Sequence, residues 1–261
     1  MDGTCLNDKK CISEATLAAL RSARDAGITV VPTTGRALSC LPYQLKDQDF
    51  YRYVISSNGA CATDLQTGES LFDARIPYRE ILDLLRAAKK HRLGISAHVE
   101  HQFVLQGELL RKLGCLSYGR DAENTVSEKD LAQYLQSSQA DVEEIQLFYF
   151  SRSMRDRTHC VLNQYHQLQK AYTDHYVEIY SSEASKGNAL CALAGKLGIP
   201  RDRIACIGDA ENDLSMFEKS GKRFAMGNAI PALKERADMI LPDNNDDGVA
   251  RAVAFLLGEG Q

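Results

Sequence analysis

The sequence has 261 residues, of which 44% are apolar and 25% charged, with a formal net charge of −4. These values indicate a soluble globular protein of one large or two modest domains, and they exclude the basic surface that nucleic acid or an anionic membrane would require. No stretch approaches the roughly 20 apolar residues of a membrane span, no secretory signal is recognisable, and eight irregularly spaced cysteines predict a reduced, cytoplasmic protein without disulfides or zinc.

The first part of the chain alternates helical and extended patterns. Residues 13–26 have the apolar spacing of an amphipathic helix that stops at Gly27. Residues 28–31 and 53–56 are short buried-type runs and predict two strands. Residues 60–76, which contain a Thr-Gly turn signal, predict a hairpin.

The pattern changes at Pro77, after which residues 79–92 predict an amphipathic helix. The middle of the chain is richer in Tyr, His and Gln, and it lacks the glycine turns that hold phosphates. Its other predicted elements are strands within 95–104, 144–150 and 176–180 and helices near 127–137 and 153–170. We therefore predict that residues 78–185 form a separate, inserted α+β domain.

The first pattern resumes at Ser185-Lys186-Gly187. The predicted elements are helices at 188–197, 212–220, 230–237 and 249–257 and strands at 203–207, 224–226 and 239–241. Short strands that alternate with helices of about 10 residues indicate a parallel, doubly wound sheet. The expected fold class is α/β, with a doubly wound core formed by residues 1–77 and 186–261 and interrupted by the inserted domain.

Polar motifs follow the predicted core strands, at the positions where ligands bind in open α/β sheets. Asp209, Asn212 and Asp213 come directly after strand 203–207, and three oxygen-bearing side chains at a tight turn suit a hard cation such as Mg2+. The structural alternative is an aspartate that caps the helix predicted to follow.

Three further motifs have two readings each. Thr34-Gly35-Arg36 follows a strand and forms either an anion-binding corner at a helix start or an ordinary capped helix. Lys186 opens a helix and either neutralises a phosphate or lies on the surface. Asn58-Gly59 either bends the chain in the left-handed conformation or lines the site, and the structural reading is favoured.

Together these motifs resemble the Cof-type branch of the haloacid dehalogenase superfamily, in which a large α+β cap is inserted between the second and third motifs. The resemblance covers essentially the whole chain and keeps the order of the family's motifs. The matching residues are Asp2-Gly3-Thr4, Thr34-Gly35-Arg36, Ser57-Asn58-Gly59-Ala60, Ser185-Lys186-Gly187, Gly208-Asp209 with Asn212-Asp213, Ala225-Met226-Gly227-Asn228-Ala229 and Asp247-Gly248-Val249-Ala250.

The resemblance implies a Mg2+-dependent phosphatase that hydrolyses small phosphorylated metabolites, such as sugar phosphates or phosphorylated cofactors, through an aspartyl-phosphate. It implies that Asp2 is the general acid and base and binds the metal through its carbonyl oxygen. Asp209 would ligate Mg2+, and Asp213 would do so directly or through water. The phosphate would be held by Thr34, Gly35, Lys186 and Asn212, and Lys186 would also act in catalysis by pairing with the nucleophile.

The first motif of this family reads Asp-x-Asp-Gly-Thr, and here x is Met1, so the nucleophilic aspartate and its apolar strand would precede Met1. Asp2 cannot take over that role, because strand positions i and i+2 lie about 6.6–6.8 Å apart whereas reacting atoms must approach to about 3–3.5 Å. We therefore expect that the sequence is N-terminally truncated and that it has negligible activity without the missing strand.

Two other functions remain open. A non-catalytic protein that binds or senses a phosphorylated ligand would carry Asn or Ser in place of the upstream aspartate. A phosphomutase would need a cap that retains a bisphosphorylated intermediate. In each case the expected partner is a small phosphorylated metabolite, with no nucleic acid and no membrane, and the protein is a monomer or a homodimer.

Overall fold

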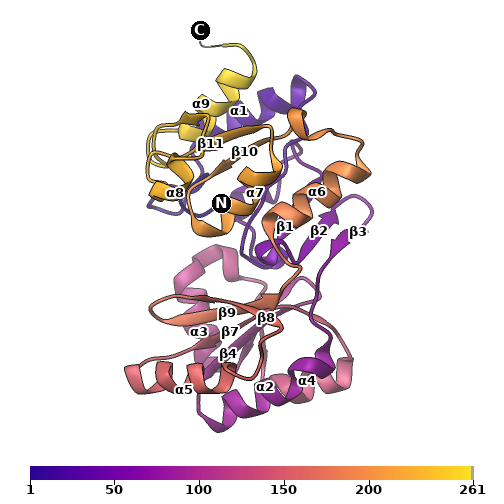
Figure 1. Ribbon diagram of the computed structural model, residues 1–261, viewed down its shortest axis with the longest axis vertical. Helices are drawn as coiled ribbons and strands as arrows, with labels where there is room; N and C mark the ends of the chain where they lie inside the picture. Colours follow the sequence, from indigo (N-terminus) through magenta and orange to yellow (C-terminus); the bar gives the residue numbers. More distant parts are fainter. Residues whose placement is uncertain (260–261) are drawn as a thin grey trace. The chain divides into compact units, whose positions relative to one another are not determined.

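The computed structural model describes residues 1–259, with Ser117 described by its backbone alone, and it divides into two compact units (Figure 1). The first unit comprises Met1–Gly35, Gln44–Asp73 and the described residues from Ser185 onward. The second unit comprises Arg36–Tyr43 and Ala74–Ala184. The chain thus passes between the units at four peptide bonds, two of which flank the short segment Arg36–Tyr43.

The first unit contains a parallel sheet and an antiparallel hairpin sheet, with helices packed around them. Its strands are β1 (Tyr53–Ser56), β2 (Cys61–Asp64), β3 (Ser70–Asp73), β10 (Ala205–Gly208), β11 (Lys222–Ala225) and β12 (Met239–Ile240). Its helices are α1 (Glu14–Asp25), α6 (Lys186–Lys196), α7 (Leu214–Lys219), α8 (Pro231–Lys234) and α9 (Gly248–Leu256). The order β10-β11-β12 is parallel, and β1-β2-β3 is an antiparallel meander.

The run from β10 through α7, β11 and α8 to β12 forms two successive βαβ units, as the alternating sequence pattern predicts. Phe217 of α7 and Phe224 of β11 are almost completely buried in the core between these elements. Burying an aromatic side chain of this size contributes about 1.5–3 kcal/mol, so this cluster fixes how the helices cover the sheet. The predicted α/β fold class is confirmed.

One predicted core strand, residues 28–31, is wrong. The structure has only isolated parallel bridges there, Val30 with Tyr51 and Thr33 with Ile55. Pro32 lies between the two bridges and has no N–H to donate to a ladder, so the pairing is interrupted at that point.

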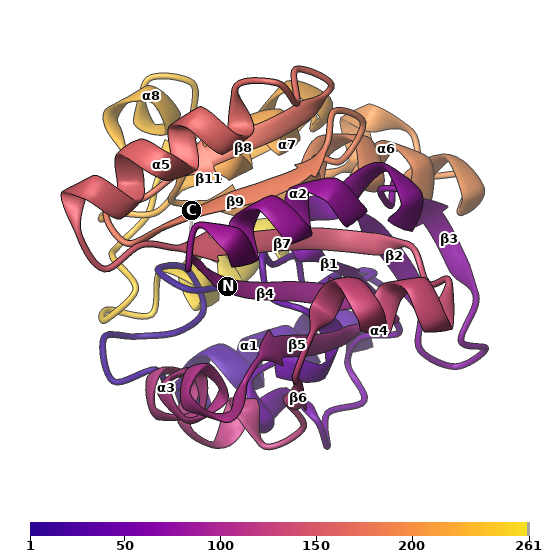
Figure 2. The ribbon, with the colours of Figure 1, turned by 90° about the horizontal axis from the view of Figure 1, so that it is seen from below.

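The second unit is a six-stranded sheet of order β6-β5-β4-β7-β9-β8, antiparallel except for the pair β5 and β6. Its strands are β4 (Gly94–Val99), β5 (Gln102–Gln106), β6 (Val126–Glu128), β7 (Val142–Phe148), β8 (Leu168–Tyr172) and β9 (Tyr176–Ser181). Its helices are α2 (Tyr78–Lys90), α3 (Glu108–Tyr118), α4 (Leu131–Ser138) and α5 (Arg152–Leu162). Figures 1 and 2 show α2, α4 and α5 on one face of the sheet.

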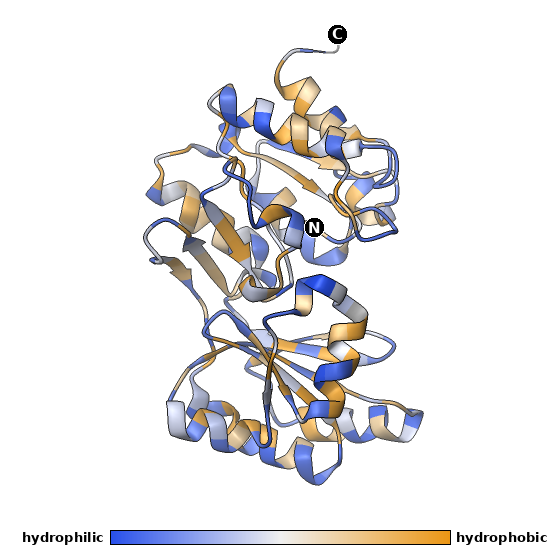
Figure 3. Ribbon diagram, turned by 180° about the vertical axis from the view of Figure 1, so that it is seen from behind, coloured by the Kyte–Doolittle hydropathy of each residue, from blue (hydrophilic) through white to orange (hydrophobic). Residues whose placement is uncertain are grey.

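The alternation of side chains along the strands separates the two faces of this sheet. Ile95 of β4 and Ile145 of β7 point into the core beneath the helices, whose outer surfaces carry the blue bands visible in Figure 3. The opposite face carries a polar network in which Ser96 donates to Gln146 at 3.1 Å and Gln146 donates to Glu144 at 2.9 Å. On the neighbouring strand β5 the same face carries Phe103 and Leu105, so one face of the sheet is apolar and the other is mixed.

Three sequence predictions for this unit need correction. The helix predicted at 153–170 ends at Leu162, because residues 168–172 pair with β9 as strand β8 and tertiary pairing overrides helical propensity. The helix predicted near 127–137 starts only at Leu131, because Asp130 caps it after strand β6. Helix α3 was not predicted, and Gly114 in its middle weakens the helical signal.

No helix among residues 1–259 is both long enough and apolar enough to cross a membrane.

Candidate active site

A buried ion pair lies at the start of α6 in the first unit. Ser185 caps this helix and places Lys186 at its first position, where Nζ lies 2.7 Å from Oδ1 of Asp213. The other oxygen of Asp213 accepts the backbone N–H groups of Asp209 (2.9 Å) and Ala210 (3.1 Å). Both side chains of the ion pair are only 5–6% exposed. Asp213 therefore holds the turn that follows β10 and anchors the lysine to it.

The electrostatic balance keeps Asp213 ionised. Burial by itself would raise the pKa of this carboxyl. The Lys186 ammonium, the amino group of Met1 and the donated hydrogen bonds outweigh burial and lower the pKa below its usual value. Because both oxygens of Asp213 already accept hydrogen bonds, a metal ion would be bound through a water molecule more readily than directly.

Asp209 has the opposite balance. Burial raises the pKa of its carboxyl, and the hydrogen bond from the Thr4 hydroxyl and the charge of the Met1 amino group only partly oppose this. Gly3 (φ +69°) lies against the same carboxylate, where a Cβ atom would overlap it, and its carbonyl accepts a hydrogen bond from Asn228 at 2.7 Å. The motif Asp2-Gly3-Thr4 is therefore fixed beside the carboxylate of Asp209. The neighbouring positive charge and hydrogen bond offset only part of the effect of burial on the pKa of this carboxylate.

These donors fit a hard divalent cation. Mg2+ prefers oxygen ligands. The carboxylate of Asp209 and the carbonyl and carboxylate oxygens of the neighbouring, exposed Asp2 are available, and Asp213 could bind the ion through a water molecule. A bound cation would also relieve the charge that burial makes unfavourable on Asp209.

Asn58 connects two of the predicted phosphate-binding segments. It adopts the left-handed conformation (φ +53°), its N–H donates to the carbonyl of Thr34 at 3.2 Å, and its side-chain oxygen accepts from Asn212 at 2.9 Å. A Cβ atom on Gly35 would press against the same amide. Both readings of Asn58 are therefore realised, since it bends the chain and also contacts the site.

Two glycines allow close backbone approach around Lys186. Gly59 has a φ of +90°, and a side chain there would overlap the backbone of Ser185 and Lys186. A side chain on Gly187 would overlap the backbone of Ser215 in α7. Any larger residue at either glycine would displace the N-terminus of α6 from its neighbours.

The structure brings the predicted site residues of the first unit into one contact network around the end of β10. This network links Thr34, Gly35, Lys186, Asp209, Asn212 and Asp213, with Gly3 and Thr4 holding the adjoining Asp2 next to it. Arg36 does not join it, because its guanidinium binds Asp121 within the second unit. The helix start expected at Thr34-Gly35-Arg36 is also wrong, since only two short 3-10 helices, Leu38–Cys40 and Tyr43–Leu45, follow before β1.

The family model of the haloacid dehalogenase-like hydrolases matches residues 1–253 of this chain. The chain belongs to this family. It is 31% identical to the 5-amino-6-(5-phospho-D-ribitylamino)uracil phosphatase YwtE of Bacillus subtilis, over 98% of the chain and 96% of that protein. The predicted superfamily is therefore confirmed, and the protein is a haloacid dehalogenase-type phosphatase, a phosphoric monoester hydrolase.

Solved structures agree with this assignment. A haloacid dehalogenase-like hydrolase from B. subtilis superposes with a TM-score of 0.82 at 28% identity, covering 97% of the chain and 96% of that protein. The subclass IIB sugar phosphatase BT4131 superposes with a TM-score of 0.80 at 19% identity, covering 100% and 97% respectively, and supports the fold alone. The match to capped, Cof-type structures therefore covers nearly the whole phosphatase chain, as expected from the sequence.

Sequence reasoning did not assign site roles to Thr4, Asn228 or Ser215. Thr4 and Asn228 hold the first motif against Asp209, and the hydroxyl of Ser215 accepts the N–H of Gly187 at 3.0 Å. Thr4 and Asn228 both lie inside sequence motifs of the family. Their position in these motifs, close to predicted metal or phosphate ligands, could have indicated a role in the site. Ser215 lies outside those motifs, and only the packing of α6 against α7 reveals it.

The phosphatase offers a direct test of Asn58. Asn58→Gly keeps the left-handed backbone but removes the oxygen that holds Asn212, so we expect affinity for inorganic phosphate to fall about tenfold, or about 1.4 kcal/mol, with little change in thermal stability. Isothermal titration calorimetry with Mg2+ present would measure the affinity. Asn58→Ala is the matched variant, and it should in addition lose stability because alanine is strained at positive φ. Unchanged phosphate affinity in Asn58→Gly would contradict this role.

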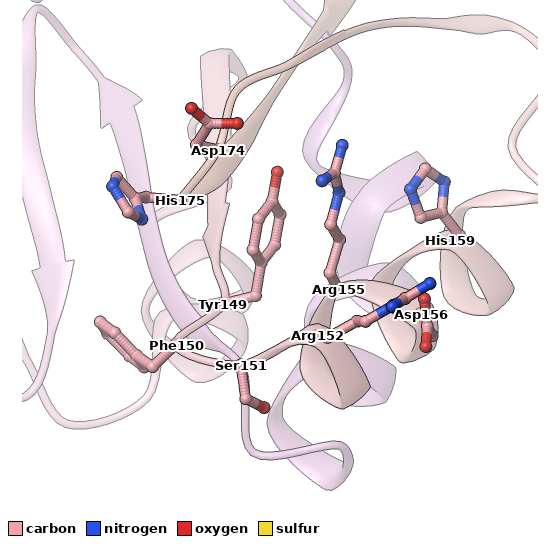
Figure 4. Close-up of a pocket in the computed structure, with 9 residues that line it drawn as sticks. All are labelled: Tyr149, Phe150, Ser151, Arg152, Arg155, Asp156, His159, Asp174 and His175. Atoms are coloured by element: carbon pink, nitrogen blue, oxygen red, sulfur yellow. The ribbon is translucent and has the colours of Figure 1, made fainter.

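A separate hollow of about 780 Å³ lies in the second unit, between the start of α5 and the turn between β8 and β9 (Figure 4). Tyr149 forms part of its wall, with its hydroxyl donating to the carbonyl of Tyr176 at 2.9 Å and with Arg155 next to its ring. Arginines and aspartates both line the hollow, so their charges balance. It contains no residue of the phosphatase motifs, and we assign it no part in the phosphate chemistry.

Proposed function

We propose that this chain is a Mg2+-dependent phosphatase that hydrolyses small phosphorylated metabolites through an aspartyl-phosphate. The observation that carries the proposal is the buried pair of Lys186 and Asp213 beside Asp209. A buried ammonium held at a helix N-terminus, next to the half-buried carboxylate of Asp209, suits the combination of a phosphate dianion and a divalent cation.

Each predicted residue then has a defined task. The hydroxyl of Thr34, the N–H of Gly35 and the amide of Asn212 donate to phosphate oxygens, and Lys186 neutralises part of their charge. Mg2+, held by Asp209, the carbonyl of Asp2 and the water-mediated Asp213, would supply further charge neutralisation at the phosphoryl group. Asp2 is exposed, so it can protonate the departing alcohol and afterwards take a proton from water.

The nucleophile in this proposal is the aspartate of the family motif, two residues before the position of Asp2 and directly before Met1. Asp209 and Asp213 cannot replace it, because Asp209 is held by Thr4 and Asp213 by Lys186 and two backbone N–H groups. We therefore propose that turnover depends on an aspartate at that upstream position.

The substrate is proposed to be a phosphate monoester of a polyhydroxylated chain. The relative YwtE is a phosphatase of a phosphorylated ribitylamino compound, and BT4131 is a sugar phosphatase, so both act on esters of this kind. We assign catalysis to the first unit and substrate selectivity to the second, the inserted cap predicted at residues 78–185.

A panel of phosphate esters tests the proposal on a chain extended by a strand that ends in aspartate. The panel includes ribitylaminouracil phosphate, hexose and pentose phosphates, nucleotides and an aryl phosphate, each with Mg2+ and with a chelator. We expect kcat/KM for a sugar or ribityl ester to exceed that for the aryl phosphate at least about tenfold, or 1.4 kcal/mol of transition-state stabilisation. Phosphate binding without turnover of any ester would instead identify a binding or regulatory protein.

A further inference from the structure

The segment Arg36–Tyr43 leaves the first unit directly after the phosphate-binding residues Thr34 and Gly35 and returns to it at Gln44. Although its neighbours in sequence on both sides belong to the first unit, the segment packs in the second. Ala37 and Cys40 are buried against Phe103 and Leu105 of β5.

One carboxylate holds both ends of this segment. Oδ2 of Asp121 lies 2.7 Å from the Arg36 guanidinium, and Oδ1 of Asp121 accepts the backbone N–H of Tyr43 at 2.8 Å. The side chains of Arg36 and Asp121 are only 4% and 6% exposed. The guanidinium also donates to the carbonyl of Cys40 at 3.2 Å and lies 4.9 Å from the centre of the Tyr118 ring.

The middle of the segment is fixed as well. The N–H of Ser39 donates to the carbonyl of His101 at 2.9 Å, and the hydroxyl of Ser39 accepts the N–H of Phe103 at 3.2 Å. A buried, charge-assisted pair and main-chain hydrogen bonds leave the segment little freedom to move independently of the second unit. Only one peptide bond separates Arg36 from Gly35, and Thr34 on the other side of Gly35 is held by backbone hydrogen bonds with Ile55 and Asn58. A displacement of the segment would therefore strain the backbone of Gly35 between these two anchored residues.

We propose that Asp121 is a positioning residue for phosphate binding: by clasping Arg36 and Tyr43, it sets the backbone of Thr34 and Gly35 and couples phosphate binding to the order of the segment Arg36–Tyr43. This inference rests on the proposed function, since it takes Thr34 and Gly35 as phosphate ligands. Coupling of this kind is reciprocal, so bound phosphate must stabilise the segment as much as the segment favours phosphate.

The reciprocal effect can be measured without any substitution. Hydrogen exchange of the 261-residue chain with Mg2+ is compared with and without saturating inorganic phosphate. We expect the amides of Ser39 and Tyr43, both hydrogen-bonded within the second unit, to exchange at least about threefold more slowly when phosphate is bound. A purely structural role for Asp121 would leave these two exchange rates unchanged.

Substitution provides the second arm. Asp121→Asn keeps an acceptor for Tyr43 but removes the charge that pairs with Arg36, and it should weaken phosphate affinity about tenfold. Asp130→Asn is the matched control, since Asp130 caps α4 and pairs with Lys89 in the same unit but has no link to the segment. If Asp121→Asn does not fold, Arg36→Lys keeps the positive charge and should weaken phosphate affinity about threefold.

The outcomes separate this inference from the function on which it rests. If the unsubstituted chain does not bind inorganic phosphate, the assignment of Thr34 and Gly35 fails first. A second outcome is that phosphate binds to the unsubstituted chain and Thr34→Ala weakens this binding. If Asp121→Asn and Arg36→Lys then bind phosphate as tightly as the unsubstituted chain, and phosphate does not slow hydrogen exchange at Ser39 and Tyr43, Asp121 has no positioning role. Equal weakening in Asp121→Asn and Asp130→Asn would also overturn it, because the effect would then follow stability alone.

Discussion

Adding an apolar strand that ends in aspartate directly before Met1 is expected to give Mg2+-dependent hydrolysis of a generic aryl phosphate at a rate at least about a thousandfold above that of residues 1–261 alone. The physical reason is that the carboxylates in the site network have other tasks. Asp209 is held by Thr4 and Asp213 is paired with Lys186, while Asp2 is the proposed general acid. The proposed covalent step requires a nucleophile at van der Waals distance from phosphorus, which the added aspartate would supply.

Three purified proteins decide this prediction: residues 1–261 alone, the extended chain and the extended chain with asparagine in place of the added aspartate. Asparagine preserves the shape of the side chain but is a poor nucleophile, so it should return activity to the level of residues 1–261 alone. Rates are measured with Mg2+ and with a chelator. Equal, Mg2+-dependent rates in all three proteins would show that the nucleophile is a different residue, although the fold would stand.

Replacing Lys186 by Met is expected to destabilise the protein by about 3–5 kcal/mol and to abolish measurable phosphate binding. Lys186 and Asp213 are buried together, so removal of the ammonium leaves an uncompensated carboxylate that accepts only two backbone hydrogen bonds. Urea unfolding followed by circular dichroism measures the stability, and calorimetric titration with inorganic phosphate measures the binding.

Two variants separate the structural part of this effect from the chemical part. Lys89→Met removes the ammonium of a more exposed pair with Asp130 and should cost no more than about 1 kcal/mol, with phosphate affinity unchanged. The double variant Lys186→Met with Asp213→Asn removes both buried charges and should regain much of the stability, yet it should still fail to bind phosphate. Recovery of phosphate binding in the double variant would refute the role of Lys186 as a phosphate ligand.

Elements with strong local signals could be predicted from the sequence. The helix Glu14–Asp25, the hairpin of β2 and β3 and the alternation from β10 to α9 follow from apolar spacing and from glycines at the turns. Elements that depend on partners could not be predicted. Strand β8 exists because β9 lies beside it, and residues 28–31 form only an isolated bridge because Pro32 interrupts the ladder.

The candidate site shows the same division. Thr34, Gly35, Lys186, Asp209, Asn212 and Asp213 were predicted because each follows a strand or opens a helix in a short motif. The role of Asn58 could not be chosen from the sequence, since a left-handed bend and a site contact predict the same Asn-Gly pair. In the structure it adopts the left-handed bend and also contacts Thr34 and Asn212, two of the predicted site residues.

The sequence by itself determined the family and the fold class and predicted most residues of the proposed phosphate site, because these depend on short-range motifs and on their order along the chain. Only the tertiary structure shows that Asp213 forms an ion pair with Lys186 and that burial raises the pKa of Asp209. It also shows that Arg36 pairs with Asp121 and does not contact the candidate site. The physical reason is that ion pairing and desolvation depend on distances between residues far apart in sequence, which local patterns do not encode.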